Sequence, residues 1–181
     1  DEQNRETIFD QLPRDLPRLM TVGRLDLDSE GLLLMTNDGD LARHLELPST
    51  GWSRKYRVRA QGQINESQLA ALADGVTIDG IRYGQVIAKL DRQMASNAWL
   101  TVAIREGKNR EIRRIMEYLG HKVSRLIRIS YGPFQLGDLE DGAIEQVKAR
   151  VLADQLGLGD GTLEASEKPT LSINKPAHKL G

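Results

Sequence analysis

The chain has 181 residues, a formal net charge of −1, 39% hydrophobic and 28% charged residues, and no cysteine. This length and composition suit a single globular domain, and the missing cysteine excludes disulfides, thiolate zinc sites and cysteine nucleophiles. No apolar run reaches the roughly 18–20 residues of a membrane span, and no signal peptide is recognisable. We therefore expect a cytoplasmic protein that does not contact a membrane.

Three elements are predicted in the first third of the chain. Residues 31–36 form a short apolar run before Asn37-Asp38-Gly39, which is typical of a buried strand. Residues 38–47 follow as a short helix capped by Asn37 or Asp38. Residues 53–61 alternate with a period of two, which predicts a strand with two different faces. One face is buried and carries Tyr56, Val58 and Ala60, and the other is basic and carries Lys55, Arg57 and Arg59.

Helices and hairpins follow in the rest of the chain. A capping box opens at Asn65, Asp79-Gly80 marks a β-hairpin, and Gly120 is the expected end of a helix. In chain order, the predicted elements are a helix at 65–74, hairpin strands at 76–78 and 81–83, a strand at 99–105, a helix at 109–119, a strand at 122–131 and an amphipathic helix at 144–156. Glycine, serine, proline and lysine dominate after Gly157, which predicts a mobile tail over residues 158–181.

Strands outnumber helices, and hairpins join them as often as helices do. This pattern predicts an α+β fold with a largely antiparallel mixed sheet and helices packed on it. We expect one domain over residues 1–157, built from two halves at roughly residues 1–60 and 61–157.

Basic residues are concentrated between positions 105 and 128, although the whole chain is nearly neutral. The basic residues are Arg105, Lys108, Arg110, Arg113, Arg114, Lys122, Arg125 and Arg128, against Glu106, Glu111 and Glu117. Several of these cations fall in the first turns of a predicted helix, where they oppose the helix dipole. A carboxylate from elsewhere or an RNA phosphate would resolve this conflict. The alternative interpretation is a solvated helix face.

Three acids at alternate positions occur in residues 24–31, Arg-Leu-Asp-Leu-Asp-Ser-Glu-Gly. A calcium loop that starts at Asp26 would need a glutamate at its twelfth position, which is Asn37, so the spacing argues against calcium. Two interpretations remain. Arg24 and Asp26 could form a structural ion pair on a loop, or guanidinium groups could keep Asp26 ionised at neutral pH, so that it acts as a nucleophile.

Four segments together resemble the small-ribosomal-subunit type family of pseudouridine synthases, and within it the large-subunit ribosomal RNA pseudouridine synthase B group. The segments are Gly23-Arg24-Leu25-Asp26 through Thr36-Asn37-Asp38-Gly39, Lys55-Tyr56-Arg57-Val58, Glu106-Gly107-Lys108-Asn109-Arg110-Glu111-Ile112-Arg113-Arg114, and Val123-Ser124-Arg125-Leu126-Ile127-Arg128 before Tyr131-Gly132. They occur in the family's order and spacing. The resemblance implies the pseudouridine synthase fold and an enzyme that isomerises a specific uridine of ribosomal RNA, 23S RNA in the first place, to pseudouridine.

The resemblance also implies roles for individual residues. Asp26 would be the nucleophile, Tyr56 would lie against the base of a flipped-out nucleotide, and Arg113 would pair with Asp26. Ile112 would form an apolar wall of the pocket, whereas Asp28 would have no catalytic role. The RNA would be held by basic side chains, which are Arg24, Lys55, Lys108, Arg110, Arg114 and Arg128.

The implied reaction exchanges no electron and adds no group, so we expect no cofactor and no metal. The expected partner is ribosomal RNA, free or within a pre-ribosomal particle, and we expect the protein to be a monomer. Two alternatives are a non-catalytic RNA-binding or ribosome-assembly module and the same enzyme acting on small-subunit RNA.

Relatives usually carry two segments ahead of the part that matches here, a strand with the pattern Asn-Lys-Pro-x-Gly and often an RNA-binding S4 domain, and we expect both to be missing. Asn174-Lys175-Pro176 lies in the predicted tail and is followed by Ala177-His178. We therefore interpret this occurrence of Asn-Lys-Pro as coincidental.

Overall fold

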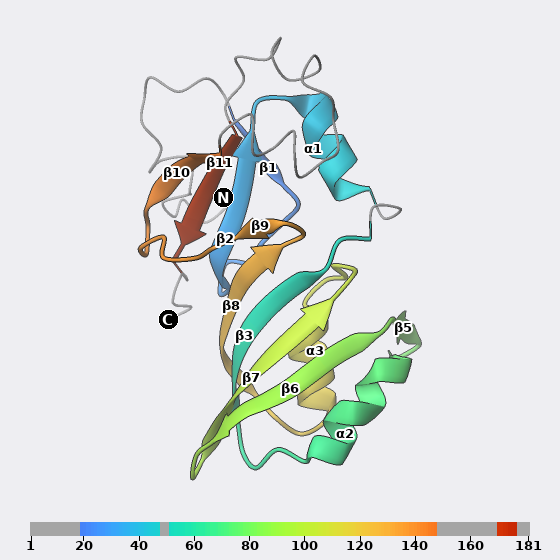
Figure 1. The fold of residues 1–181 in the computed structure, drawn as a ribbon. Coiled ribbons are helices and arrows are strands. Elements are labelled where there is room, and N and C mark those ends of the chain that lie inside the picture. The colour runs from blue at the N-terminus through green and yellow to red at the C-terminus, as the bar shows by residue number, and fades with distance from the viewer. Residues whose placement is uncertain (1–18, 48–50, 148–169, 177–181) are drawn as a thin grey trace.

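One mixed sheet organises the part of the chain that the computed structural model describes, residues 19–47, 51–147 and 170–176 (Figure 1). Its strands are β1 (Met20–Val22), β2 (Glu30–Thr36), β3 (Arg54–Gln61), β6 (Val86–Gln93), β7 (Asn97–Ile104), β8 (Val123–Tyr131), β9 (Phe134–Gln135), β10 (Ile144–Val147) and β11 (Thr170–Lys175). Their order across the sheet is β10-β11-β2-β8-β3-β7-β6, with β1 beside β2 and β9 beside β8. Only β2 and β8 run parallel among these pairs of described strands. The α+β prediction with a largely antiparallel sheet is confirmed.

Helices pack on the sheet in two places. The helices are α1 (Gly39–Glu46), α2 (Glu66–Ala71), its 3-10 continuation η3 (Leu72–Asp74) and α3 (Glu111–Tyr118). α2, η3 and α3 bury Leu69, Leu72 and Ile115 against the apolar face of β3, β7 and β8, and α3 lies behind β7 in Figure 1. α1 packs against β1 and β2 in a second cluster. No helix among the described residues is long and apolar enough to cross a membrane.

Several helices, strands and turns that were predicted from short stretches of sequence are present in the structure. The Asp38 side chain caps α1 by accepting hydrogen bonds from the N–H groups of residues 40 and 41, and the Asn65 side chain caps α2 in the same way. Asp79 and Gly80, both at positive φ, join β4 (Val76–Ile78) to β5 (Ile81–Tyr83). Tyr56 and the other predicted inward residues of β3 are buried.

Two predictions for the end of the chain are wrong where the structure describes it. Residues 144–147 form strand β10 instead of the start of a helix, and residues 170–175 form strand β11 within the predicted tail. β11 pairs with β10 on one side and with β2 on the other, and it buries Leu171 and Ile173 in an apolar cluster. The free energy gained by burying these two side chains offsets the conformational entropy that the segment loses when it is ordered. The remainder of the predicted helix and tail, residues 148–169 and 177–181, lies outside the described residues.

Candidate active site

Asp26 lies in the loop that leads from β1 to β2. The Ser29 N–H donates to the Asp26 carbonyl at 2.9 Å and closes a turn. β2 then enters the sheet with Gly31 opposite Arg128 of β8. A Cβ at Gly31, whose φ is +102°, would collide with the Arg128 carbonyl oxygen. This close approach requires glycine and fixes the loop relative to β8.

Lys175, the last residue of β11, holds the same loop. Its ammonium donates to the carbonyl oxygens of Ser29 at 2.6 Å and Asp26 at 2.9 Å. Lys175 is 7% exposed, and burial lowers its pKa to about 8. The interpretation of Asn174-Lys175-Pro176 as coincidental is therefore wrong, because Lys175 supports the candidate nucleophile. The match to the family's Asn-Lys-Pro pattern was the signal that could have revealed it.

Arg110 and Arg113 reach the loop from the start of α3, and both bind mainly to Asp28. Arg110 forms a bidentate pair with the Asp28 carboxylate, with both distances 3.0 Å, and lies 3.8 Å from the Asp26 carboxylate. Arg113 lies 3.5 Å from the Asp28 carboxylate and donates to the Asp28 carbonyl at 2.9 Å. The predicted Arg113–Asp26 ion pair is wrong, because Arg113 contacts the acid two residues further along. Hydrogen bonding from Arg110 lowers the pKa of Asp28.

The Asp26 carboxylate stays accessible beside these ion pairs. Its side chain is 38% exposed, and no described residue donates a hydrogen bond to it. It lines a hollow of about 70 Å³ together with Tyr56 and Ile112. A larger open cleft of about 820 Å³ adjoins this hollow, because Arg24 and Tyr56 line both. The arrangement places the Asp26 carboxyl group next to an aromatic ring, an apolar wall and space for a longer ligand.

The predicted RNA-binding residues divide into three sets. Arg24, Lys108 and Arg110 line the hollow with Asp26. Arg128 lines the cleft, but it is only 2% exposed, and its Nε donates to a β2 carbonyl at 2.9 Å, so it also joins β2 to β8. The third set lies away from both cavities.

Lys55 and Arg114 form this third set. Lys55 is exposed and follows the alternation of β3, so it points to the face opposite Tyr56. Arg114 is exposed on α3, whereas its neighbour Arg113 is buried. The structure therefore does not bring these two residues to Asp26.

Glu111, the first residue of α3, is a buried acid in the wall of the hollow. It is 3% exposed, its Oε1 accepts a hydrogen bond from the Lys108 N–H at 3.3 Å, and its buried Oε2 has no partner among the described residues. Burial raises the pKa of Glu111 to about 7, and the negative charge of Glu106 adds to the rise. Composition and spacing gave no signal of this burial.

The amino-acid sequence is similar to those of RNA pseudouridine synthases. A family model described as RNA pseudouridylate synthase matches residues 1–118. An RNA pseudouridine synthase of Rickettsia felis is 50% identical over 152 residues, which cover 84% of this chain and 66% of the relative. A ribosomal large subunit pseudouridine synthase B of Haemophilus influenzae is 46% identical over 138 residues, which cover 75% of this chain and 38% of the relative.

A solved structure agrees with these relatives. The crystal structure of a pseudouridylate synthase superposes with a TM-score of 0.64 at 30% sequence identity, covering 73% of this chain and 57% of that chain. The chain spans 66% or less of the length of the relatives described here. The family model covers more than half of the chain, and the fold and relatives agree with it, so the chain belongs to the RNA pseudouridylate synthase family.

Proposed function

We propose that the chain isomerises a specific uridine of ribosomal RNA to pseudouridine, with Asp26 as the nucleophile on a flipped-out nucleotide. The observation that carries the proposal is the accessible Asp26 carboxylate, which lines the hollow with Tyr56 and Ile112 and accepts no hydrogen bond from any described residue. Membership of the family supports the reaction type. The similarity to a ribosomal large subunit pseudouridine synthase B favours 23S RNA as the substrate, and we expect the reaction to take place in the cytoplasm.

The proposed chemistry balances without an added group. A carboxylate oxygen of Asp26 forms a bond either to the ribose C1′ or to C6 of the uracil. The C1′–N1 bond breaks and the C1′–C5 bond forms, the bond to Asp26 breaks again and regenerates the carboxylate, C5 loses its proton and N1 gains one. Both routes release the C5 hydrogen to solvent, so the same measurement detects either route.

The hollow suits a base that has left its stack. Extruding a nucleotide costs a few kcal/mol, and stacking on an aromatic side chain such as Tyr56 returns roughly 1–3 kcal/mol. Ile112 supplies an apolar wall opposite polar groups of the loop. Arg24 and Lys108 line the hollow and supply positive charge for a phosphate of the extruded nucleotide, although the Lys108 ammonium also lies 3.2 Å from Glu106.

Asp26→Asn tests the proposal. The variant should lose turnover of ribosomal RNA that carries 5-tritiated uridine, while its melting temperature and its RNA affinity stay those of the wild type. Asp138→Asn, an exposed aspartate in the loop after β9, is the matched control and should release tritium normally. Release by Asp26→Asn at the wild-type rate would exclude Asp26 as the nucleophile.

The substrate RNA needs a separate test. Pseudouridine mapping of 23S and 16S RNA from a strain that lacks the gene should show one missing site in 23S RNA. A missing site in 16S RNA would redirect the proposal to the small subunit. A wild-type protein that binds ribosomal RNA but never releases tritium would support the non-catalytic module instead.

A further inference from the structure

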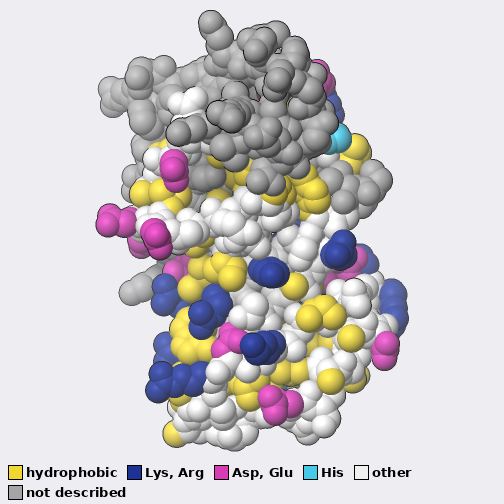
Figure 2. All heavy atoms as spheres, in the orientation of Figure 1, with side chains coloured by type: hydrophobic (Ala, Val, Ile, Leu, Met, Phe, Trp, Pro, Cys, Tyr) yellow, Lys and Arg dark blue, Asp and Glu magenta, His cyan; other side chains and the backbone are white. Residues whose placement is uncertain are grey.

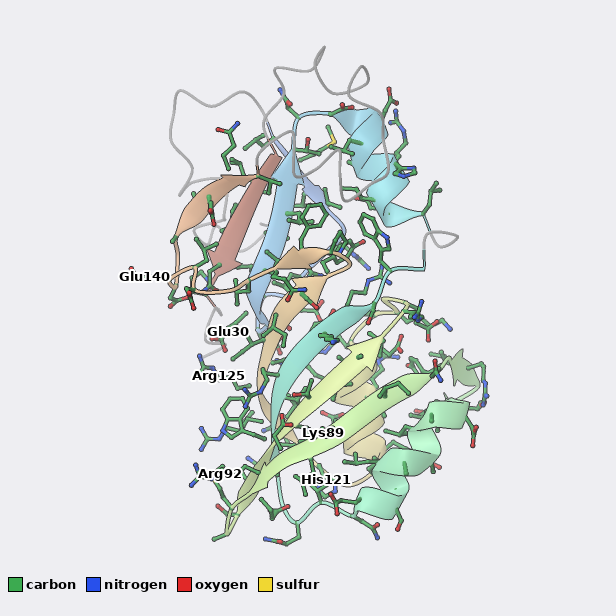
Figure 3. The ribbon with its side chains drawn as sticks, in the orientation of Figure 1. Glu30, Lys89, Arg92, His121, Arg125 and Glu140 are labelled. Atoms are coloured by element: carbon green, nitrogen blue, oxygen red, sulfur yellow. The ribbon has the colours of Figure 1, made fainter. Side chains whose placement is uncertain are left out.

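A basic surface lies on the face of the sheet that points away from α2 and α3. We call it the outer face and define it by Arg57, Arg59, Lys89, Arg92, Trp99 and Arg125, which come from β3, β6, β7 and β8. Figure 3 labels Lys89, Arg92 and Arg125 on these strands, and Figure 2 shows Lys and Arg side chains around apolar ones over the same region. No described helix or strand packs on this face.

The outer face is separate from the candidate active site. Successive residues of a strand point to opposite faces of its sheet. Tyr56 lines the hollow that contains Asp26, and the next residue, Arg57, therefore points to the outer face. Thr101 and Arg57 both contact Asp91 there, at 2.6 and 3.7 Å, which confirms that these side chains share the face.

The strand register aligns several of these residues in one row across four strands. Arg125 of β8 lies opposite Arg59 of β3, which lies opposite Trp99 of β7, which lies opposite Arg92 of β6. Neighbouring strands are about 4.8 Å apart, so this row spans about 14 Å. Lys89 lies in the adjacent row, since it pairs with Thr101, the partner of Arg57.

The carboxylates on this surface do not neutralise its cations. Glu30 binds Arg125 at 2.9 Å, and Asp91 lies 3.7 Å from Arg57. Arg59, Lys89 and Arg92 have no acidic partner among the described residues. Arg59 also lies opposite Arg125, whose charge Glu30 already balances. An anionic ligand would therefore meet the charges of Arg59, Lys89 and Arg92, which no described carboxylate balances.

The row also contains a surface on which a base can stack. The Arg57 guanidinium lies 5.2 Å from the centre of the Trp99 ring, and the indole is half-buried rather than covered. Unpaired bases stack on aromatic rings and on guanidinium planes, while cations beside them contact the phosphates. An acidic protein segment would bind the cations but would gain nothing from stacking on the half-buried indole.

We propose that the outer face binds a single-stranded segment of the substrate RNA at a distance from the target uridine. The inference rests on the proposed function for the identity of the RNA. Binding on both faces of the sheet would let the protein recognise a folded RNA that surrounds it, with catalysis on one face and added affinity on the other. The cations supply the salt-dependent part of this affinity, and Trp99 supplies stacking.

The test compares two RNAs, a long 23S fragment and a short stem-loop that contains only the target. The Arg59→Ala/Arg92→Ala double variant should weaken binding of the long fragment about tenfold and reduce the slope of log Kd against log salt by about 2. Binding and tritium release with the stem-loop should stay at wild-type values. Trp99→Leu should weaken binding of the long fragment about fivefold or more without changing the salt slope.

Arg43→Ala is the control, because Arg43 is an arginine of α1 whose side chain is 72% exposed. An equal effect of this control would overturn the inference, as would unchanged affinity and salt slope in the double variant. An equal loss for the two RNAs would also overturn it. If the wild type binds the fragment as expected but releases no tritium, the proposed function fails while the outer face stands as an RNA-binding surface.

Discussion

Replacing Lys175 with methionine removes the donor that ties the Asp26 loop to β11. The Lys175 ammonium donates hydrogen bonds to the carbonyls of Ser29 and Asp26 at 2.6 and 2.9 Å. Hydrogen bonds from a charged donor contribute on the order of 1.5–3 kcal/mol each. Part of this gain offsets the burial of the ammonium, which lowers the pKa of Lys175 to about 8. Methionine keeps the apolar stem but leaves the carbonyls without a donor. We expect a loss of about 2 kcal/mol of unfolding free energy.

Thermal unfolding and tritium release together measure this effect. A loss of 2 kcal/mol should lower Tm by roughly 4–8 °C in a domain of this size. The turnover number should fall further than RNA affinity, because the loop that carries Asp26 would shift while the basic residues around it remain. Lys122→Met, at an exposed lysine before β8, should change neither Tm nor turnover.

The pH dependence of stability distinguishes the effect of the buried Lys175 ammonium from the effect of packing its side chain. The pKa of Lys175 is lowered in the folded state, so the unfolded chain binds more protons between about pH 8 and its ordinary pKa near 10.5. Wild-type stability should therefore rise relative to Lys175→Met over this range, and the gain is lost as pH falls through 8. Equal Tm and equal turnover for Lys175→Met and the wild type would refute the assigned role of Lys175.

Two further predictions follow from the other charged groups around Asp26. The raised pKa of Glu111 means that the folded state favours the neutral acid. Glu111→Gln should therefore become more stable relative to the wild type as pH rises from about 4.5 to 7, by up to about 3 kcal/mol of unfolding free energy. Denaturant titrations at pH 5 and 8 measure this difference between the two proteins, and a difference that does not change with pH would contradict the prediction. Asp28→Asn should lower Tm at neutral pH and reduce turnover, because Arg110 and the buried Arg113 lose their carboxylate. The Tm difference should shrink as pH falls below the lowered pKa of Asp28, and a difference independent of pH would count against the ion pairs.

Elements that depend on neighbouring residues could be predicted from the sequence. The α1 cap at Asp38 and the turn at Asp79-Gly80 are set by side-chain hydrogen bonds and positive φ values within a few residues. The alternation in β3 could be recognised because its buried and basic positions differ strongly in chemistry. These signals need no knowledge of what lies elsewhere in the fold.

The strands at the end of the chain depend on distant partners instead. Ile144 and Val147 are three residues apart, a spacing that fits one face of a helix as well as a short strand. β11 has alternating Leu171 and Ile173, but it lies among polar residues, and its partner β2 is more than a hundred positions earlier. Only the register with β2 and β10 shows that these two side chains are buried.

The same limit applies to the candidate site. The cation-rich start of α3 indicated that a carboxylate was needed, and a carboxylate is present, but spacing could not tell Asp28 from Asp26. The difference comes from the path of the loop, which Gly31 and Lys175 fix through contacts with β8 and β11. The burial of Glu111 has the same origin in three-dimensional packing.

In the proposed mechanism, the two aspartates of the loop divide two incompatible tasks. A carboxylate that orients guanidinium groups must use its lone pairs, as Asp28 does with Arg110 and Arg113. A nucleophile must keep its lone pairs free. Asp26 meets this condition at 3.8 Å from Arg110, with no hydrogen bond from a described residue. Because Asp28 binds the arginines, the Asp26 carboxylate remains available for the attack that we propose.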